Sequence, residues 1–358
     1  VNIIAQPQVN NGTGLNIDAR NSTMATSTLS AKDVEELSAT SIDQALQGRL
    51  PGVDIGTTSG DPGAGMSIRI RGTSSINGSA DPLIVLDGMP YETQIPDDFN
   101  FASADEQGYA QLLNIAPSDI KDITVLKDAA STAVWGSRAA NGVLIINTKR
   151  GIIGKPIVTY NLKATVSHQP AALPLLTGDQ YAELIPEEIA NRNGLPINPL
   201  NYPEFSYDKR DPLNYYNYSN NTDWLDVITQ TGYIQDHNVN MQGGGEKARY
   251  YASVGYLDQK GTTVGTALSR ITSKVNLDYN VSNRLRFTSD FSYTPVDQNL
   301  NYTQSLRNMA YNKMPNMAIY QYDEYGNQTP VFFSPESNIQ GKYPSTANPL
   351  ALAKAALA

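Results

Sequence analysis

From Lys155 onward, apolar and polar residues alternate with a period of two in five separate segments of about ten residues each. Successive side chains of a β-strand point to opposite faces, so each segment predicts a strand with one apolar and one polar face. This length and pattern are typical of transmembrane barrel strands, although a strand of a soluble sandwich alternates in the same way. The segments are 158–166, 234–243, 250–258, 269–280 and 284–293.

The connections between these segments favour the barrel over the sandwich. About 65 residues separate the first two segments, whereas only GGGEK separates the second from the third. QKGTTVGTALS then joins the third to the fourth, and little more than Ser282 and Asn283 joins the fourth to the fifth. Long and short connections alternate when one rim of a barrel carries large loops and the other carries tight turns.

Composition excludes several other classes of protein. The chain has no cysteine, which excludes disulfides, thiolate metal sites and a cysteine nucleophile. Its net charge is -9 and no basic cluster exceeds two residues, so nucleic-acid binding is not supported. Apolar runs reach about four residues, far fewer than the roughly 20 that a membrane-spanning helix needs. Tyrosine outnumbers phenylalanine 21 to 7, as at a membrane interface or a glycan-binding surface, but also as in a β-rich protein with exposed tyrosines.

The residues before the alternating segments have a different pattern. Residues 1–40 are rich in Asn, Ser and Thr and predict an extended lead-in, and VNIIAQPQVNNGTG lacks the features of an export signal, which we expect to be removed or to lie outside this chain. SIDQALQGRLPG predicts a short helix, and VDI, MSIRIRG and PLIVLDG predict strands. A strand, a helix at 129–135 and another strand follow, so 41–151 is predicted to be a mixed α/β domain.

Three long motifs in this domain carry a family resemblance. SIDQALQGRLPGVDI, SIRIRGTSSINGSADPLIVLDGMP and IAPSDIKDITVLKDAASTAVWGSRAANGVLIINTKRG resemble the plug domain of SusC/RagA-type TonB-linked outer-membrane transporters of Bacteroidetes-type bacteria. TDWLDVITQTGYIQDHNVNMQGGGEKARYYASVGYLDQKG resembles the stretch that opens the barrel in that family. The resemblance covers about residues 28–294.

The resemblance implies a fold of two parts. An N-terminal mixed α/β plug domain, residues 41–151, is followed by antiparallel transmembrane β-strands, residues 152–358, from a barrel of about 22 strands. Five strands cannot close such a barrel, because the free edges would leave backbone groups unpaired in lipid. We therefore expect this chain to be part of a longer one.

The resemblance also implies a function and its partners. It implies active import of an oligosaccharide, or less readily a peptide, across the bacterial outer membrane, with the plug gating the barrel lumen. The partners would be TonB energised by ExbB and ExbD, a SusD-like surface lipoprotein acting as a lid, and outer-membrane lipid, with a dimer of such pairs as a further assembly. A surface glycan-binding β-rich protein without transport is the alternative.

Candidate functional residues follow from the same resemblance. A TonB-coupling segment would add as a strand to its partner, unless it is only a frayed terminus; its residues are Val1, Asn2, Ile3, Ile4 and Ala5. Arg69 and Arg71 are expected to contact acidic residues of the barrel wall. Two substrate-facing plug loops would offer aromatic rings for stacking on sugars and polar groups for their hydroxyls, namely Ser74, Ser75, Asn77, Tyr91, Asp97, Asp98, Phe99, Asn100 and Phe101.

No enzyme, cofactor or metal site is expected. The two histidines, His168 and His237, belong to no catalytic or zinc motif. A glycosidase-type carboxylate pair, whose members can be far apart in a chain, is the enzyme alternative. GDPGAG lacks the Lys-Ser/Thr of a phosphate-binding loop, and the acidic stretch around Asp97 lacks the glycine of a calcium loop.

Overall fold

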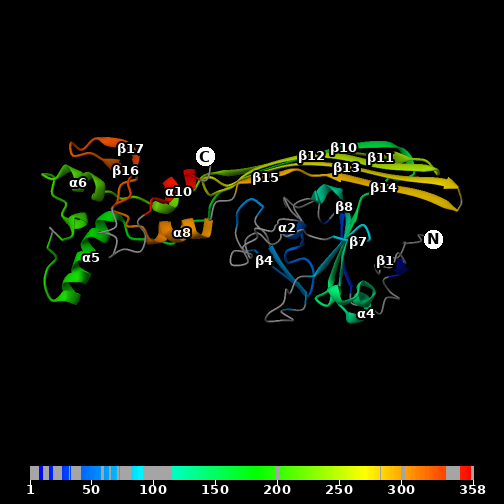
Figure 1. The fold of residues 1–358 in the computed structure, drawn as a ribbon, viewed down its shortest axis with the longest axis horizontal. Coiled ribbons are helices and arrows are strands. Elements are labelled where there is room, and N and C mark those ends of the chain that lie inside the picture. Colours follow the sequence, from blue (N-terminus) through cyan, green and yellow to red (C-terminus); the bar gives the residue numbers. More distant parts are fainter. Residues whose placement is uncertain are drawn as a thin grey trace, which may run out of the picture. The chain divides into compact units, whose positions relative to one another are not determined.

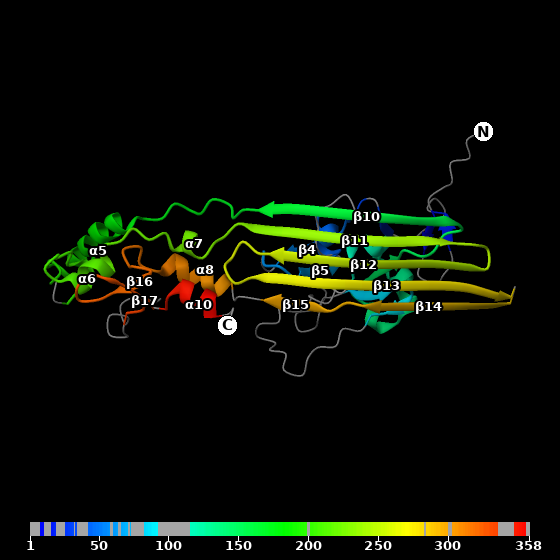
Figure 2. The same ribbon diagram turned by 90° about the horizontal axis from the view of Figure 1, so that it is seen from above.

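The computed structural model describes most of the chain, in two compact units. The first unit contains residues 1–165, 234–259 and 268–298, and the second contains residues 166–233, 260–267 and 299–358. We call them the plug–wall unit and the connection unit (Figures 1 and 2). The described residues are 8–10, 16–18, 26–31, 33, 42–57, 60–63, 66–70, 72, 82–91, 115–198, 201–282, 284–299, 303–335 and 347–355.

The plug is built on a five-stranded sheet with the order β3-β8-β9-β6-β7. Strands β6 and β9 are parallel and the other pairs are antiparallel. Its core strands read as continuous apolar runs, such as VLII in β9, because both faces of the sheet are covered. The strands are β3 (Thr26–Ser30), β6 (Leu83–Leu86), β7 (Met89–Pro90), β8 (Ile120–Leu126) and β9 (Val143–Thr148).

Smaller elements complete the plug. The hairpin of β4 (Val53–Thr57) and β5 (Met66–Ile70) and the helix α2 (Ile42–Leu46) pack their apolar side chains on one face of the sheet. The predicted mixed α/β fold is thereby confirmed. The remaining elements are β1 (Gln8–Asn10), β2 (Asn16–Asp18), α4 (Ala129–Thr132) and the 3-10 helices η3 (Pro117–Asp119), η4 (Ala133–Trp135) and η5 (Ser137–Ala139).

The five alternating segments form one antiparallel sheet, which we call the wall, with the strand order β10-β11-β12-β13-β14. This confirms the predicted strands, most of which are longer than the sequence indicated (Figure 2). A short strand β15 (Val296–Asn299) also pairs with β13. The wall strands are β10 (Gly154–Ser167), β11 (Gly232–Gly244), β12 (Ala248–Lys260), β13 (Ala267–Ser282) and β14 (Leu285–Tyr293).

The wall has the reverse of the polarity of a soluble sheet. Along β13, Lys274 is 8% exposed, Val275 is 48% exposed and Asn276 is 1% exposed. The face toward the plug is polar, whereas the other face exposes valine, leucine, phenylalanine and tyrosine side chains. Soluble proteins bury apolar side chains, so this pattern is that of strands with an aqueous side and a lipid side. Buried polar residues of the wall include Asn238, Asn240, Ser253, Arg270, Thr272, Lys274, Asn276 and Asp278.

The connection unit gathers residues that lie in the sequence between β10 and β11, between β12 and β13, and after β15. Its core gathers Tyr218, Trp224, Ile228, Leu306 and Phe333 with two methionines. The stretch YDEYGNQ forms the turn of the hairpin of β16 and β17, with Gly326 at φ 81°. The elements are α5 (Gly178–Asn193), η6 (Pro203–Phe205), α6 (Pro212–Tyr218), α7 (Trp224–Val227), α8 (Thr303–Asn312), β16 (Tyr320–Tyr322), β17 (Gln328–Phe332) and α10 (Pro349–Ala355).

Within the described ranges, no helix has both the length and the hydrophobicity that crossing a membrane requires.

Candidate functional site: the contact between plug and wall

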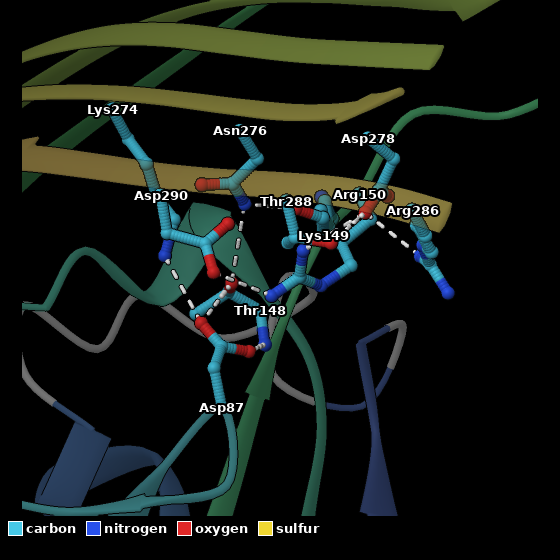
Figure 3. A network of polar contacts seen from close by, with 10 residues as sticks. All are labelled: Asp87, Thr148, Lys149, Arg150, Lys274, Asn276, Asp278, Arg286, Thr288 and Asp290. Carbon is cyan, nitrogen blue, oxygen red and sulfur yellow. Dashed lines mark hydrogen bonds and ion pairs between the residues drawn. The ribbon is translucent and has the colours of Figure 1, made fainter. Parts of the chain in front are cut away.

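The plug and the wall meet through a network of charged and hydrogen-bonding side chains (Figure 3). Asp87 lies in the turn between β6 and β7 with φ 48°, next to Gly88 with φ 87°. Aspartate tolerates this left-handed conformation better than most residues. Its carboxylate accepts hydrogen bonds from the Thr148 backbone N–H at 2.9 Å and the Thr148 hydroxyl at 2.6 Å. From the wall, the Lys274 ammonium lies 3.5 Å from the same carboxylate, so Asp87 joins two plug strands to β13.

The segment that leaves β9 carries the second part of the network. The Arg150 guanidinium donates to Asp290 on β14 at 2.8 Å and lies 3.5 Å from Asp278 on β13. Arg286 also donates to Asp278 at 2.8 Å. The Asn276 amide donates to the Lys149 carbonyl at 2.9 Å, which adds a main-chain contact. Two plug-side positions are thus held by three wall side chains (Figure 3).

Electrostatics keep Arg150 charged. Partial burial by itself would lower the pKa of Arg150, but the hydrogen bond and the negative charge of Asp290 raise it above its ordinary value. Asp87 and Asp278 act in the same direction. The guanidinium therefore stays protonated at any physiological pH.

Two further contacts lie away from this network. The fully buried Tyr251 on β12 donates its hydroxyl to Asp119 of η3 at 2.8 Å. Gln298 of β15 donates to the Pro62 carbonyl at 2.8 Å. Close to Arg150, the backbone of Gly151 runs so near β12 that a Cβ there would clash with the Tyr250 backbone nitrogen. The plug therefore contacts β12, β13, β14 and β15, with polar groups predominating at these points.

The structure places the predicted contact residues differently. Arg69 lies in β5, exposed, in register with Asp54 of β4. Arg71 lies outside the described residues. Their contact with the wall stays a prediction, and the plug side chains that the structure does place against the wall include Asp87, Asp119 and Arg150. The signal for them was present in the sequence, as an aspartate in the LDG turn and a basic pair directly before the first wall strand.

Of the other predicted site residues, Tyr91 is the one that lies in the described part of the chain. Tyr91 is half-buried, packs against the plug core and donates its backbone N–H to the Ile84 carbonyl at 2.8 Å. The remaining substrate-facing residues and the TonB-coupling segment lie outside the described residues, so their roles stay predictions, as do the domain boundaries near 40 and 151. They are Ser74, Ser75, Asn77, Asp97, Asp98, Phe99, Asn100 and Phe101, and Val1, Asn2, Ile3, Ile4 and Ala5.

The arrangement joins plug and wall through paired polar groups. In the ranges that the structure describes, no three or more His, Cys, Asp or Glu side chains gather in a way that would hold a metal ion. The network pairs charges of opposite sign and main-chain groups across an interface, which fixes one body against another. Such contacts can also be exchanged for water when the bodies separate.

Comparison with known proteins identifies the family. The sequence profile described as TonB-dependent Receptor Plug Domain matches residues 18–143. The chain is 33% identical to TonB-dependent receptor P26 of Formosa agariphila over 88% of its own length and 29% of that protein. It is 35% identical to TonB-dependent receptor SusC of Bacteroides thetaiotaomicron over 66% of its own length and 21% of that protein. It therefore spans less than a third of either relative.

A solved structure shares the fold. The RagAB peptide importer in its open-open state superposes with a TM-score of 0.72 at 23% identity, over 91% of this chain and 38% of that one. The chain belongs to the SusC/RagA family of TonB-dependent receptors of the bacterial outer membrane, and it comprises their plug domain and part of their barrel.

Proposed function

We propose that this chain works in the TonB-dependent active import of an oligosaccharide or a peptide across the outer membrane. The observation that carries the proposal is the polar contact between plug and wall. The plug keeps its own apolar core around Ile123, Leu144 and Ile146, so it can leave the wall without exposing that core. What breaks instead are ion pairs and hydrogen bonds that water can replace.

The inner face of the wall supports the same reading. Buried side-chain atoms there that have no hydrogen-bond partner among the described residues include Asn238 Nδ2, Ser253 Oγ, Gln259 Oε1 and Asn276 Oδ1. Buried polar atoms are normally hydrogen-bonded, so atoms of this kind indicate an interface that water enters. A hydrated interface lowers the barrier to moving the plug, because water can replace each lost contact at once.

The remaining parts of the proposal come from the family. TonB, energised by ExbB and ExbD, would pull on the N-terminal segment, residues 1–5, and thereby remodel the plug. A SusD-like lipoprotein would close over the ligand, which would meet the plug loops after β5 and β7, and pairs of this kind would assemble as dimers. A relative is described as a peptide importer, which supports the peptide alternative for this chain.

Deletion of the coupling segment tests the proposal. Residues 1–5 and their upstream neighbours are removed from the full-length protein, and uptake and surface binding of a labelled nutrient are measured in whole cells. The nutrient is first identified by growth of a gene-deletion strain on a panel of glycans and peptides. We expect uptake to be lost while binding is retained. Uptake that persists would refute the proposal, and binding without any uptake in the unmodified protein would favour a surface glycan-binding protein.

A further inference from the structure

We propose that Lys127 is a positioning residue that couples the first strand of the plug sheet, β3, to the hairpin of β4 and β5. The inference rests on the proposed function, because it names a residue through which a pull on the N-terminal segment would reach the ligand side of the plug. Lys127 directly follows β8 and is half-buried. Its ammonium donates to the Ser27 hydroxyl of β3 at 2.6 Å and to the Pro51 carbonyl in the turn before β4. One side chain thus joins parts of the plug that lie 100 and 76 positions away from it in the sequence.

The place of β3 in the sheet makes it the strand that a pull would move first. It lies at one edge and pairs with β8, so it can leave without breaking the pairs among β8, β9, β6 and β7. Thr26 at the start of β3 pairs with Leu126 at the end of β8, so Lys127 lies beside the N-terminal end of β3. A pull from the N-terminal side therefore reaches the contact between Ser27 and Lys127 before it reaches the rest of the strand.

The turn before β4 carries the other end of the link. Gly52 in this turn has φ 74°, and a Cβ there would be 3.7 Å from the Lys127 ammonium. Val53, the first residue of β4, pairs with Ile70, the last residue of β5. Ile70 precedes Ser74, where the predicted substrate-facing loop begins, by four positions in the sequence. Lys127 therefore holds the base of the hairpin at the end from which the chain continues to that loop.

The chemistry of an ammonium suits this role. It has three N–H donors and no acceptor, and its hydrogen bonds are stronger than those of a neutral donor. If Ser27 moves away with β3, the Lys127 ammonium either replaces it with water or follows it away from the Pro51 carbonyl. Both responses change how the base of the hairpin is held. Because coupling between two sites is reciprocal, a ligand that shifts the hairpin also changes how firmly β3 is held.

The apolar core provides a second link between the same elements. Leu29 of β3 belongs to the buried cluster that contains Leu46 of α2 and Ile55 and Ile68 of the hairpin. Apolar contacts are non-directional and do not depend on the Ser27 hydroxyl. Ser27→Ala therefore isolates the polar link, because it leaves the apolar one in place.

Hydrogen exchange of the full-length protein in detergent, without ligand or TonB, tests the coupling. The variants are Ser27→Ala, Lys127→Met and the double variant. Thr28→Val is the matched control, because the Thr28 hydroxyl lies 3.1 Å from that of Thr124 and joins β3 to β8. We expect exchange in the segment 53–57 to be roughly tenfold faster in Lys127→Met, as for the loss of a hydrogen bond to a charged group. It should also be faster in Ser27→Ala, no faster in the double variant than in Lys127→Met, and unchanged in Thr28→Val.

Uptake in whole cells tests the role of the coupling in import. Lys127→Met should retain surface binding of the labelled nutrient and lose most of its uptake, whereas Lys127→Arg, which keeps the charge and donors, should restore uptake in large part. Cells without TonB give the background and would reveal a leaking plug. A merely structural lysine would lower binding and uptake together.

The outcomes separate this inference from the proposed function. Exchange in the segment 53–57 that does not change in Ser27→Ala, or that rises equally in Thr28→Val, would overturn the coupling. Unchanged uptake by Lys127→Met would overturn its role in import. If the unmodified protein imports nothing, the proposed function fails, and the exchange measurement still decides the coupling. If Lys127→Met does not assemble, Ser27→Ala, which keeps the lysine, replaces it in both measurements with the same criteria.

Discussion

The ion pair between Lys274 and Asp87 gives the sharpest test of how the plug is held. The two side chains are 10% and 14% exposed, and the ammonium and carboxylate are 3.5 Å apart. At an effective dielectric constant of about 20, two charges at this distance attract by about 5 kcal/mol before desolvation is subtracted. Lys274→Met leaves Asp87 with only the two Thr148 donors described above. We expect a loss of about 3 kcal/mol, as for other buried pairs that lose one partner.

A double-mutant cycle separates the pair from its surroundings. Asp87→Asn removes the charge but keeps a residue that tolerates the positive φ of the turn. The double variant should therefore cost less than the sum of the single variants by about 1–3 kcal/mol. The exposed pair of Lys121 and Asp122, 3.9 Å apart with the lysine 69% exposed, provides the control. Lys121→Met should change plug stability by less than about 0.5 kcal/mol.

Hydrogen exchange measures this equilibrium directly. In the full-length protein, the Thr148 N–H is protected by Asp87, so its exchange reports separation at this point. A loss of about 3 kcal/mol corresponds to roughly 10²-fold faster exchange in the segment 143–150, because 1.4 kcal/mol is a factor of ten. Exchange that does not change in Lys274→Met, or single effects that simply add, would refute the view that this pair fastens the plug.

Three further predictions address the interface, the lipid side and the connection unit. Tyr251→Phe leaves Asp119 without a buried donor and should cost about 1–3 kcal/mol, seen as faster exchange in the segment 117–126; unchanged exchange would contradict this. Val275→Lys places a charge on the exposed apolar face and should make the free energy of folding into the outer membrane less favourable by about 2–4 kcal/mol. The folded fraction is measured by heat-modifiable mobility on gels, and a normal folded fraction would argue that this face does not contact lipid. The pKa of Lys313 is about 8 in the folded protein and 10.5 in its ordinary, solvent-exposed state, so the unfolded chain binds more protons between these two pH values. The free energy of unfolding, relative to that of Lys313→Met, should therefore rise by roughly 3 kcal/mol from pH 8 to pH 10.5. Urea unfolding measures this difference, and a difference that does not change with pH would exclude the predicted shift.

The sequence was most informative where structure depends on local pattern. Alternation with a period of two predicted all five principal wall strands, because each residue's face is decided by its own position in the strand. The helix α5 was not predicted, since it contains Pro186 and is weakly two-faced, and it starts with a capping box of Thr177 and Gln180. Its start is also fixed from outside, because a Cβ at Gly178 would clash with the backbone of residue 220.

The site was less predictable than the fold. Asp87 lies more than 60 positions from Thr148 in the sequence, and Arg150 lies 140 positions from Asp290. No local pattern records which polar side chain of β13 or β14 meets which plug residue, since that depends on how two bodies pack. The family resemblance supplied the general expectation of plug arginines against acidic wall residues, and the structure supplies one such arginine, Arg150, at a position other than Arg69.

The reversed polarity of the wall has a consequence for biogenesis. Lys274 and Asn276 are covered by the plug, while Val275 between them is exposed. In water alone, no arrangement of the strand both buries the valine side chain and keeps the two polar side chains in contact with the plug. Insertion into the bilayer and acquisition of the native register must therefore be one event. A newly synthesised chain that meets no lipid or detergent should aggregate through its exposed leucine and phenylalanine side chains rather than fold.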